Sequence, residues 1–155
     1  MNDGTSASGG GILRAPGGKM VYAYSFYFGQ GSNMCAESLA LLVGIYICDK
    51  LEIPNTTVLC DSRILVEMMK GKLSPPWHIL PIIRKISRYK SIISEVKHYY
   101  REGNTVADAL AKEAHSHLNN RISISESQLT PHMRALIFLD SMNVSNLRFS
   151  KSYYC

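Results

Sequence analysis

The chain has 155 residues and a mass of 17.3 kDa, with 46% hydrophobic and 19% charged residues, a composition typical of one globular domain rather than a disordered chain. Lysine and arginine outnumber aspartate and glutamate by 17 to 12, so the net charge is +5 and we expect a polyanionic partner. The four cysteines form no CxxC pair, no apolar signal segment opens the chain, and no apolar run is long enough to span a bilayer. These patterns exclude a disulfide scaffold, a zinc site, secretion and membrane insertion, and we expect a monomeric, intracellular protein of the nucleus or the cytoplasm.

In the first half of the chain, the predicted elements alternate between strands and one long helix. The strands come from runs of β-branched and aromatic residues, whereas the segment before them is rich in glycine and serine. The helix has apolar residues on nearly every face, which predicts burial against a sheet. In chain order we expect strands at 12–14, 20–28 and 56–60, a helix at 35–51, and a second helix that follows Asp61-Ser62 and ends near residue 69.

The second half of the chain continues this alternation. An amphipathic helix is predicted at 77–89, with isoleucines on one side and basic residues on the other. We expect Trp77 to anchor this helix in the core, and the alternative is that it stacks on a sugar. A strand is predicted at 91–100, a helix at 106–117 and one more short helix at about 133–142. Strands followed by alternating strands and helices predict an α/β fold with a mixed sheet.

The positive charge is concentrated in one quarter of the chain. Between residues 63 and 101 there are nine basic residues against two acidic ones, so this segment carries +7 and all other residues together carry −2. A segment of this kind is typical of proteins that contact a phosphate backbone. Its basic residues are Arg63, Lys70, Lys72, Arg84, Lys85, Arg88, Lys90, Lys97 and Arg101.

Four carboxylates lie at predicted strand and helix ends: Asp3, Glu37, Asp61 and Asp108. Each also has a structural interpretation. Asp3 forms a turn pair with the glycine that follows it, and Asp61 is a natural N-cap. Glu37 and Asp108 gain from helix dipoles, and Asp108 also completes a loose capping box with Thr105. Taken together, carboxylates at the ends of one α/β sheet can bind Mg²⁺ or Mn²⁺, and two such ions can activate water for attack on phosphorus.

The order of short motifs along the chain carries a family resemblance. The motifs are Asp3-Gly4-Thr5, GGGILR at 9–14, AESLAL at 36–41, Asp61-Ser62, and YREGNTVADALA at 100–111. As a set they resemble the type 1 ribonuclease H domains, and most closely the plant reverse-transcriptase-like branch that is related to retroelements. The resemblance covers residues 2 to about 118, so we expect a ribonuclease H-like domain at 1–118 and a C-terminal extension at 119–155.

The resemblance implies a ribonuclease H-like mixed sheet flanked by helices, and hydrolysis of the RNA strand of RNA–DNA hybrids. It implies four catalytic, metal-binding carboxylates, which by motif are Asp3, Glu37, Asp61 and Asp108, and two Mg²⁺ or Mn²⁺ ions. His98 lies ten residues before the last carboxylate, where active relatives have a histidine that assists proton transfer or product release; the alternative is an exposed histidine at a strand end. The expected nucleic-acid-binding residues are Arg84, Lys85, Arg88, Arg101 and Asn104.

The start of the chain departs from the family pattern. The resemblance implies a central strand that lies mostly upstream of the first carboxylate, whereas only Met1 and Asn2 precede Asp3. We therefore expect a truncated first strand, exposed edges on its neighbours, and a poorly held Asp3. Three functions stay open: an active hybrid ribonuclease, a catalytically silent nucleic-acid-binding module derived from a retroelement, and a protein-interaction domain that uses the apolar residues 136–139.

Overall fold

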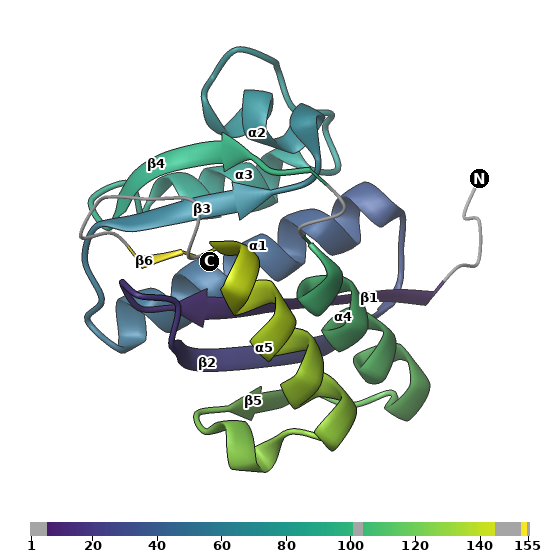
Figure 1. The fold of residues 1–155 in the computed structure, drawn as a ribbon. Coiled ribbons are helices and arrows are strands. Elements are labelled where there is room, and N and C mark those ends of the chain that lie inside the picture. The colour runs from purple at the N-terminus through teal and green to yellow at the C-terminus, as the bar shows by residue number, and fades with distance from the viewer. Residues whose placement is uncertain (1–5, 101–103, 145–152, 155) are drawn as a thin grey trace.

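The computed structural model describes residues 6–100 and 104–144, and the backbone of 153–154. Its strands form a six-stranded mixed sheet in the order β4-β3-β6-β1-β2-β5, with helices on both faces (Figure 1). The α/β fold predicted from the sequence is thereby confirmed. The strands are β1 (Ser6–Arg14), β2 (Met20–Gln30), β3 (Thr56–Cys60), β4 (Ile93–His98), β5 (Arg121–Ser123) and β6 (Tyr153–Tyr154). The helices are α1 (Asn33–Lys50), α2 (Arg63–Met69), α3 (Leu80–Ser87), α4 (Thr105–His117) and α5 (Pro131–Val144), with a 3₁₀ turn at Glu126–Gln128.

Strand β1 is longer than its composition predicts. Its serines and glycines are poor strand formers, yet it pairs with β2 in antiparallel register from Ser6 to Arg14. The glycines are required because helices press on both faces of this strand. A Cβ atom on Gly9 would lie 2.5 Å from the Cβ of Ala40 in α1, and one on Gly10 would lie 2.5 Å from the Cβ of Leu110 in α4.

Helix α1 covers one face of the sheet and is buried along most of its length, as its apolar pattern predicts. Two tyrosines of β2 fix it to the sheet. The hydroxyl of Tyr22 donates to the carbonyl oxygen of Gly44, and that of Tyr24 donates to the carbonyl oxygen of Ala40, both at 2.7 Å. These bonds satisfy the phenol groups inside the core and set the height of α1 above β1 and β2.

Strands β3 and β4 are parallel, and α2 and α3 pack with α1 around them in a core that includes Val58, Leu65 and Ile86. The predicted helix at 77–89 is shorter in the structure, because the chain turns at 77–79 and Pro81 lies in the first turn of α3. Trp77 therefore precedes the helix and is 85% exposed. The prediction that it anchors the core was wrong.

Helices α4 and α5 cover the face of the sheet opposite α1 (Figure 1). They share one core cluster with β2, in which Val106 and Leu110 of α4 meet Met133 and Ile137 of α5. Helix α5 extends the predicted helix at 133–142 by two residues at each end. No helix in the described part of the chain combines the length and the apolar character needed to span a bilayer.

The central position of the sheet, between β3 and β1, is held by the two-residue strand β6. It pairs in parallel with β3 at Thr56 and Thr57, and antiparallel with β1 at Arg14. The sequence predicts a truncated first strand and exposed neighbouring edges. Asp3 lies outside the described residues, so the truncation itself stays a prediction, and the structure adds that the C-terminal segment reaches this position.

Candidate active site

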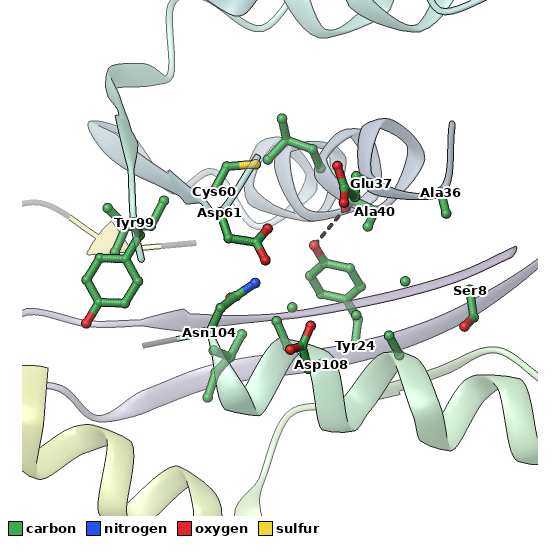
Figure 2. Close-up of a pocket in the computed structure, with 18 of the residues that line it drawn as sticks. Ser8, Tyr24, Ala36, Glu37, Ala40, Cys60, Asp61, Tyr99, Asn104 and Asp108 are labelled. Atoms are coloured by element: carbon green, nitrogen blue, oxygen red, sulfur yellow. Dashed lines mark hydrogen bonds between the residues drawn. The ribbon is translucent and has the colours of Figure 1, made fainter. Parts of the chain in front are cut away.

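A pocket of about 310 Å³ lies where β1, β3, α1, α4 and α5 meet (Figure 2). Three of the four motif carboxylates line it: Glu37, Asp61 and Asp108. In Figure 2 the side chains of Asp61, Asn104 and Asp108 point into the space between α1 and α4. Asp3, the fourth motif carboxylate, lies outside the described residues.

Asp61 follows β3 directly and is half-buried. Its structural interpretation as the N-cap of α2 was wrong, because Ser62 holds that position and its hydroxyl accepts from the amide of Leu65 at 3.4 Å. The carboxylate of Asp61 is therefore released from capping, and it lines the pocket instead.

The helix-dipole interpretation fits Asp108 better than Glu37. Helix α1 begins at Asn33, so Glu37 is its fifth residue and lies beyond the first turn, where the dipole acts most strongly. Asp108 lies in the first turn of α4, and the N-cap of that helix is Asn104 rather than Thr105, which the predicted capping box requires at that position. The pocket is what these two carboxylates have in common.

The donor set of the pocket suits a hard divalent cation, since carboxylate oxygens are the ligands that Mg²⁺ and Mn²⁺ prefer. The carboxylates come from three different elements, α1, the end of β3, and α4. Within the described residues, however, no three His, Cys, Asp or Glu side chains are close enough together to form a metal-binding group. The chemistry of these residues therefore fits a metal site, and Asp3, the fourth motif carboxylate, lies outside the described residues.

His98 ends β4 beside Asp61, because β4 pairs in register with β3. Its Nε2 atom lies 3.1 Å from the backbone carbonyl oxygen of Asp61, and its ring contacts Tyr100 edge-on at 5.4 Å. The side chain is exposed and does not line the pocket. This position agrees with an exposed histidine at a strand end, and it also leaves His98 next to one catalytic candidate.

The predicted nucleic-acid-binding residues fall into two groups. Asn104 lines the carboxylate pocket, whereas Arg84, Lys85 and Arg88 are exposed on and just after α3. Lys85 and Arg88 line a separate hollow of about 330 Å³ between α1 and α3, together with Tyr46. The structure therefore does not bring the α3 basic residues to the carboxylate pocket, and Arg101 lies outside the described residues.

Most of the basic segment is available for a polyanion. In the described part of the chain its two acidic residues pair with neighbours, Glu67 with Lys72 at 4.0 Å and Glu95 with Lys97 at 3.0 Å. Six further basic residues of the segment have no ion pair within the residues that the structure describes: Arg63, Lys70, Arg84, Lys85, Arg88 and Lys90. All six are exposed.

The sequence predictions missed a buried ion pair at the wall of the pocket. Arg14 of β1 and Asp140 of α5 lie 2.5 Å apart and are 3% and 9% exposed. The guanidinium also donates to the carbonyl oxygens of Gly18 at 2.9 Å and Ile137 at 3.3 Å. Arg14 and Asp140 are 126 residues apart in the chain, and no local pattern indicates their pairing.

Cys60 lines the pocket, and its thiol is affected by the negative charge of the nearby carboxylates. Burial raises the pKa of its thiol to about 12, and a hydrogen bond with the backbone of Ser62 acts in the opposite direction. The nearby carboxylates of Asp61 and Glu37 raise it further. The thiol is thus held protonated at the edge of an acidic site.

The fold is that of ribonuclease H. The structure resembles RNase H1 from Halobacterium salinarum with a TM-score of 0.68 and 21% identity, covering 72% of this chain and 87% of that one. It resembles LC11-RNase H1, which was solved in complex with an RNA/DNA hybrid, with a TM-score of 0.65 and 21% identity, covering 73% and 96%. At this level of identity the likeness concerns the fold alone.

The family is identified by the sequence. Residues 1–114 match the reverse transcriptase-like family, and the chain belongs to it. An Arabidopsis thaliana protein named "Putative ribonuclease H protein" is 30% identical over 112 residues, which are 71% of this chain and 18% of that protein. The chain therefore spans less than a fifth of the length of this relative.

Proposed function

We propose that this domain binds RNA–DNA hybrids and hydrolyses their RNA strand, with two Mg²⁺ or Mn²⁺ ions held by Asp3, Glu37, Asp61 and Asp108. The observation that carries the proposal is that Glu37, Asp61 and Asp108, from three elements far apart in the sequence, line one pocket. When bound, such ions supply an activated water and stabilise the leaving oxygen.

The chain's own residues have separate roles in this proposal. Asp61 is fixed by the end of β3 and is free of the capping role that Ser62 takes. Asp108 is fixed by the first turn of α4, and Glu37 by α1, which the hydrogen bond from Tyr24 to Ala40 ties to the sheet. These rigid elements preorganise the carboxylates better than loops would.

Binding of the hybrid would use its backbone rather than its bases, because A-form grooves hide the sequence. Asn104 reaches the pocket beside Asp61 and Asp108, in position to contact a sugar or phosphate near the reacting bond. The exposed cations of α3 lie further off and would hold phosphates away from that bond. The fold relative that was solved with an RNA/DNA hybrid supports this choice of substrate.

The proposal is tested by a cleavage assay on a duplex with a labelled RNA strand, with Mg²⁺ and with EDTA. Asp61→Asn keeps the volume of the side chain but removes its charge, and we expect a loss of rate of at least about a hundredfold. Glu95→Gln is the matched control, since it removes an exposed carboxylate whose partner is Lys97 and should leave the rate unchanged. Cleavage that persists in EDTA, or in Asp61→Asn, contradicts the proposal.

A second function is favoured by the exposed cations of the basic segment. Six of its basic residues are exposed and have no ion pair within the described residues, so the domain is also a candidate for a catalytically inactive nucleic-acid-binding module. This alternative predicts hybrid binding that weakens steeply with salt, without any cleavage. Salt-insensitive or absent binding would instead favour a protein-interaction domain.

A further inference from the structure

The hollow between α1 and α3 is separate from the carboxylate pocket. Its volume is about 330 Å³, and within the described part of the chain no acidic residue lines it. Both sites use α1, but Glu37 of the pocket and Tyr46 of the hollow are nine positions apart, which is about two and a half turns of an α-helix. Their side chains therefore leave opposite faces of α1, and the hollow is a second site rather than an extension of the pocket.

The hollow combines apolar side chains with an accessible aromatic ring. Leu42 and Val43 of α1 line it and are half-buried, and Tyr46, one turn further along the helix, is 47% exposed. The Nζ atom of Lys50 lies 5.2 Å from the centroid of the Tyr46 ring. This cation–π contact restrains the ring, so that an accessible flat surface is held beside an apolar one.

Positive charge accompanies the apolar lining. Lys85 and Arg88 line the hollow from the side of α3, and both are exposed without an ion pair among the residues that the structure describes. Lys50 adds a third cation beside the ring. The residues outside the described ranges contain two acidic side chains against three basic ones, so the basic segment stays positive wherever they lie.

An unpaired nucleic-acid strand matches this combination of groups. Each of its residues carries a flat base that can stack on a tyrosine and a phosphate that can contact a cation. A duplex offers its phosphates alone, because its bases are stacked inside, and the ring and the apolar side chains would then have no partner. The volume of the hollow lies at the lower end of the range of small-ligand sites, about 300–1,000 Å³, which suits one nucleotide rather than a longer run.

We propose that this hollow is a second nucleic-acid site, which takes one base of an unpaired strand against Tyr46 while the neighbouring phosphates contact Lys85 and Arg88. The site has little sequence preference, because every base can stack. The inference rests on the nucleic-acid binding proposed above and not on the hydrolysis. It assigns the cations of α3 to a single-stranded continuation of the substrate, on the face of α1 opposite the carboxylate pocket.

The test is the fluorescence anisotropy of a labelled uridine decamer, titrated with the full chain in EDTA so that no metal supports cleavage. Tyr46→Ala should weaken binding about tenfold or more, because the stacking of one base on an aromatic side chain contributes that much. Tyr46→Phe keeps the ring and should bind within about twofold of the unchanged chain. A blunt RNA–DNA hybrid, whose bases are all paired, should show no comparable loss with Tyr46→Ala.

The dependence on salt separates the two kinds of contact. Arg88→Gln removes a phosphate contact, so it should weaken decamer binding and reduce the slope of log affinity against log salt by about 0.7. Tyr46→Ala should leave this slope unchanged, because stacking releases no counterions. Lys112→Gln is the matched control, since it removes the same charge from an exposed residue of α4, on the opposite face of the sheet, and should change neither the affinity nor the slope.

The inference is overturned if Tyr46→Ala binds the decamer as tightly as the unchanged chain does. It is also overturned if the hybrid binds and the decamer does not, which would assign the α3 cations to the duplex and leave the proposed function intact. Binding of an acidic, tyrosine-containing peptide in place of the decamer would assign the hollow to a protein partner instead. A failure of both nucleic acids to bind contradicts the proposed function as well.

Discussion

Gly10 lies where β1 approaches α4 closely, and we expect Gly10→Ala to be strongly destabilising. The added Cβ would lie 2.5 Å from the Cβ of Leu110, 2.8 Å from the backbone nitrogen of Ala111 and 3.0 Å from the carbonyl carbon of Leu110. Two of these atoms are helix backbone and the third is fixed to it, so no side chain can rotate away and α4 must shift. Overpacking of this kind costs about 1–3 kcal/mol, and we expect about 3 kcal/mol here.

Equilibrium unfolding in urea, followed by circular dichroism, measures this cost. With a slope of about 2 kcal/mol per molar urea, the midpoint should fall by about 1.5 M. Gly31→Ala is the matched control, because its Cβ would meet Ala7 and Cys35 at 3.6 and 3.9 Å, which is ordinary contact, and Gly31 has no positive φ. That variant should be unchanged or more stable by up to about 1 kcal/mol, because alanine restricts the unfolded chain. If both variants unfold at the same urea concentration, the close approach of α4 to β1 is refuted.

Two further predictions concern buried polar groups. Asp140→Asn leaves the guanidinium of Arg14 buried without its counter-charge, so it should lower the free energy of unfolding by about 3–5 kcal/mol. Glu95→Gln, which breaks an exposed pair, should change the free energy of unfolding by less than about 1 kcal/mol. Equal effects of the two variants would show that the pair of Arg14 with Asp140 is solvated. Because the raised pKa keeps the Cys60 thiol protonated until the pH approaches 12, iodoacetamide at pH 8 should modify the half-buried Cys35 and spare Cys60, as read by mass spectrometry. Rapid modification of Cys60 in the folded protein would contradict the burial that raises its pKa.

The elements with strong local patterns were predicted well. The strand at 56–60 has the predicted bounds, and α1 and α4 begin within two residues of their predicted starts, because β-branched runs and apolar periodicity are local signals. β1 was predicted only at 12–14, because its glycines disfavour a strand until the packing of α1 and α4 is known. The two-residue strand β6 has no local signal, since its pairing partners lie about a hundred residues or more away in the chain.

In the candidate site, too, the features with a local sequence signal were predicted and those that depend on distant contacts were not. The motif order predicted Glu37, Asp61 and Asp108 in the lining of the pocket but not Asp140. The structural interpretation of Asp61 as a cap failed because the adjacent Ser62 takes that position. Trp77 was misplaced because a large aromatic residue is usually buried, and only the turn before α3 reveals that this one is not. The contact of Arg14 with Asp140 depends on how α5 docks, which the sequence pattern of α5 does not specify.

The carboxylate pocket is formed by two regions of the chain, the part that matches the family model and helix α5. The family match ends at residue 114, yet Asp140 lines the pocket from outside that match and pairs with Arg14 in its wall. A protein cut at the family boundary would keep all the motif carboxylates and still lose a wall of their pocket, together with the charge that balances Arg14. The pocket therefore extends beyond the family match to α5, and a change at Asp140 would alter the electrostatics of the pocket without any change in its motifs.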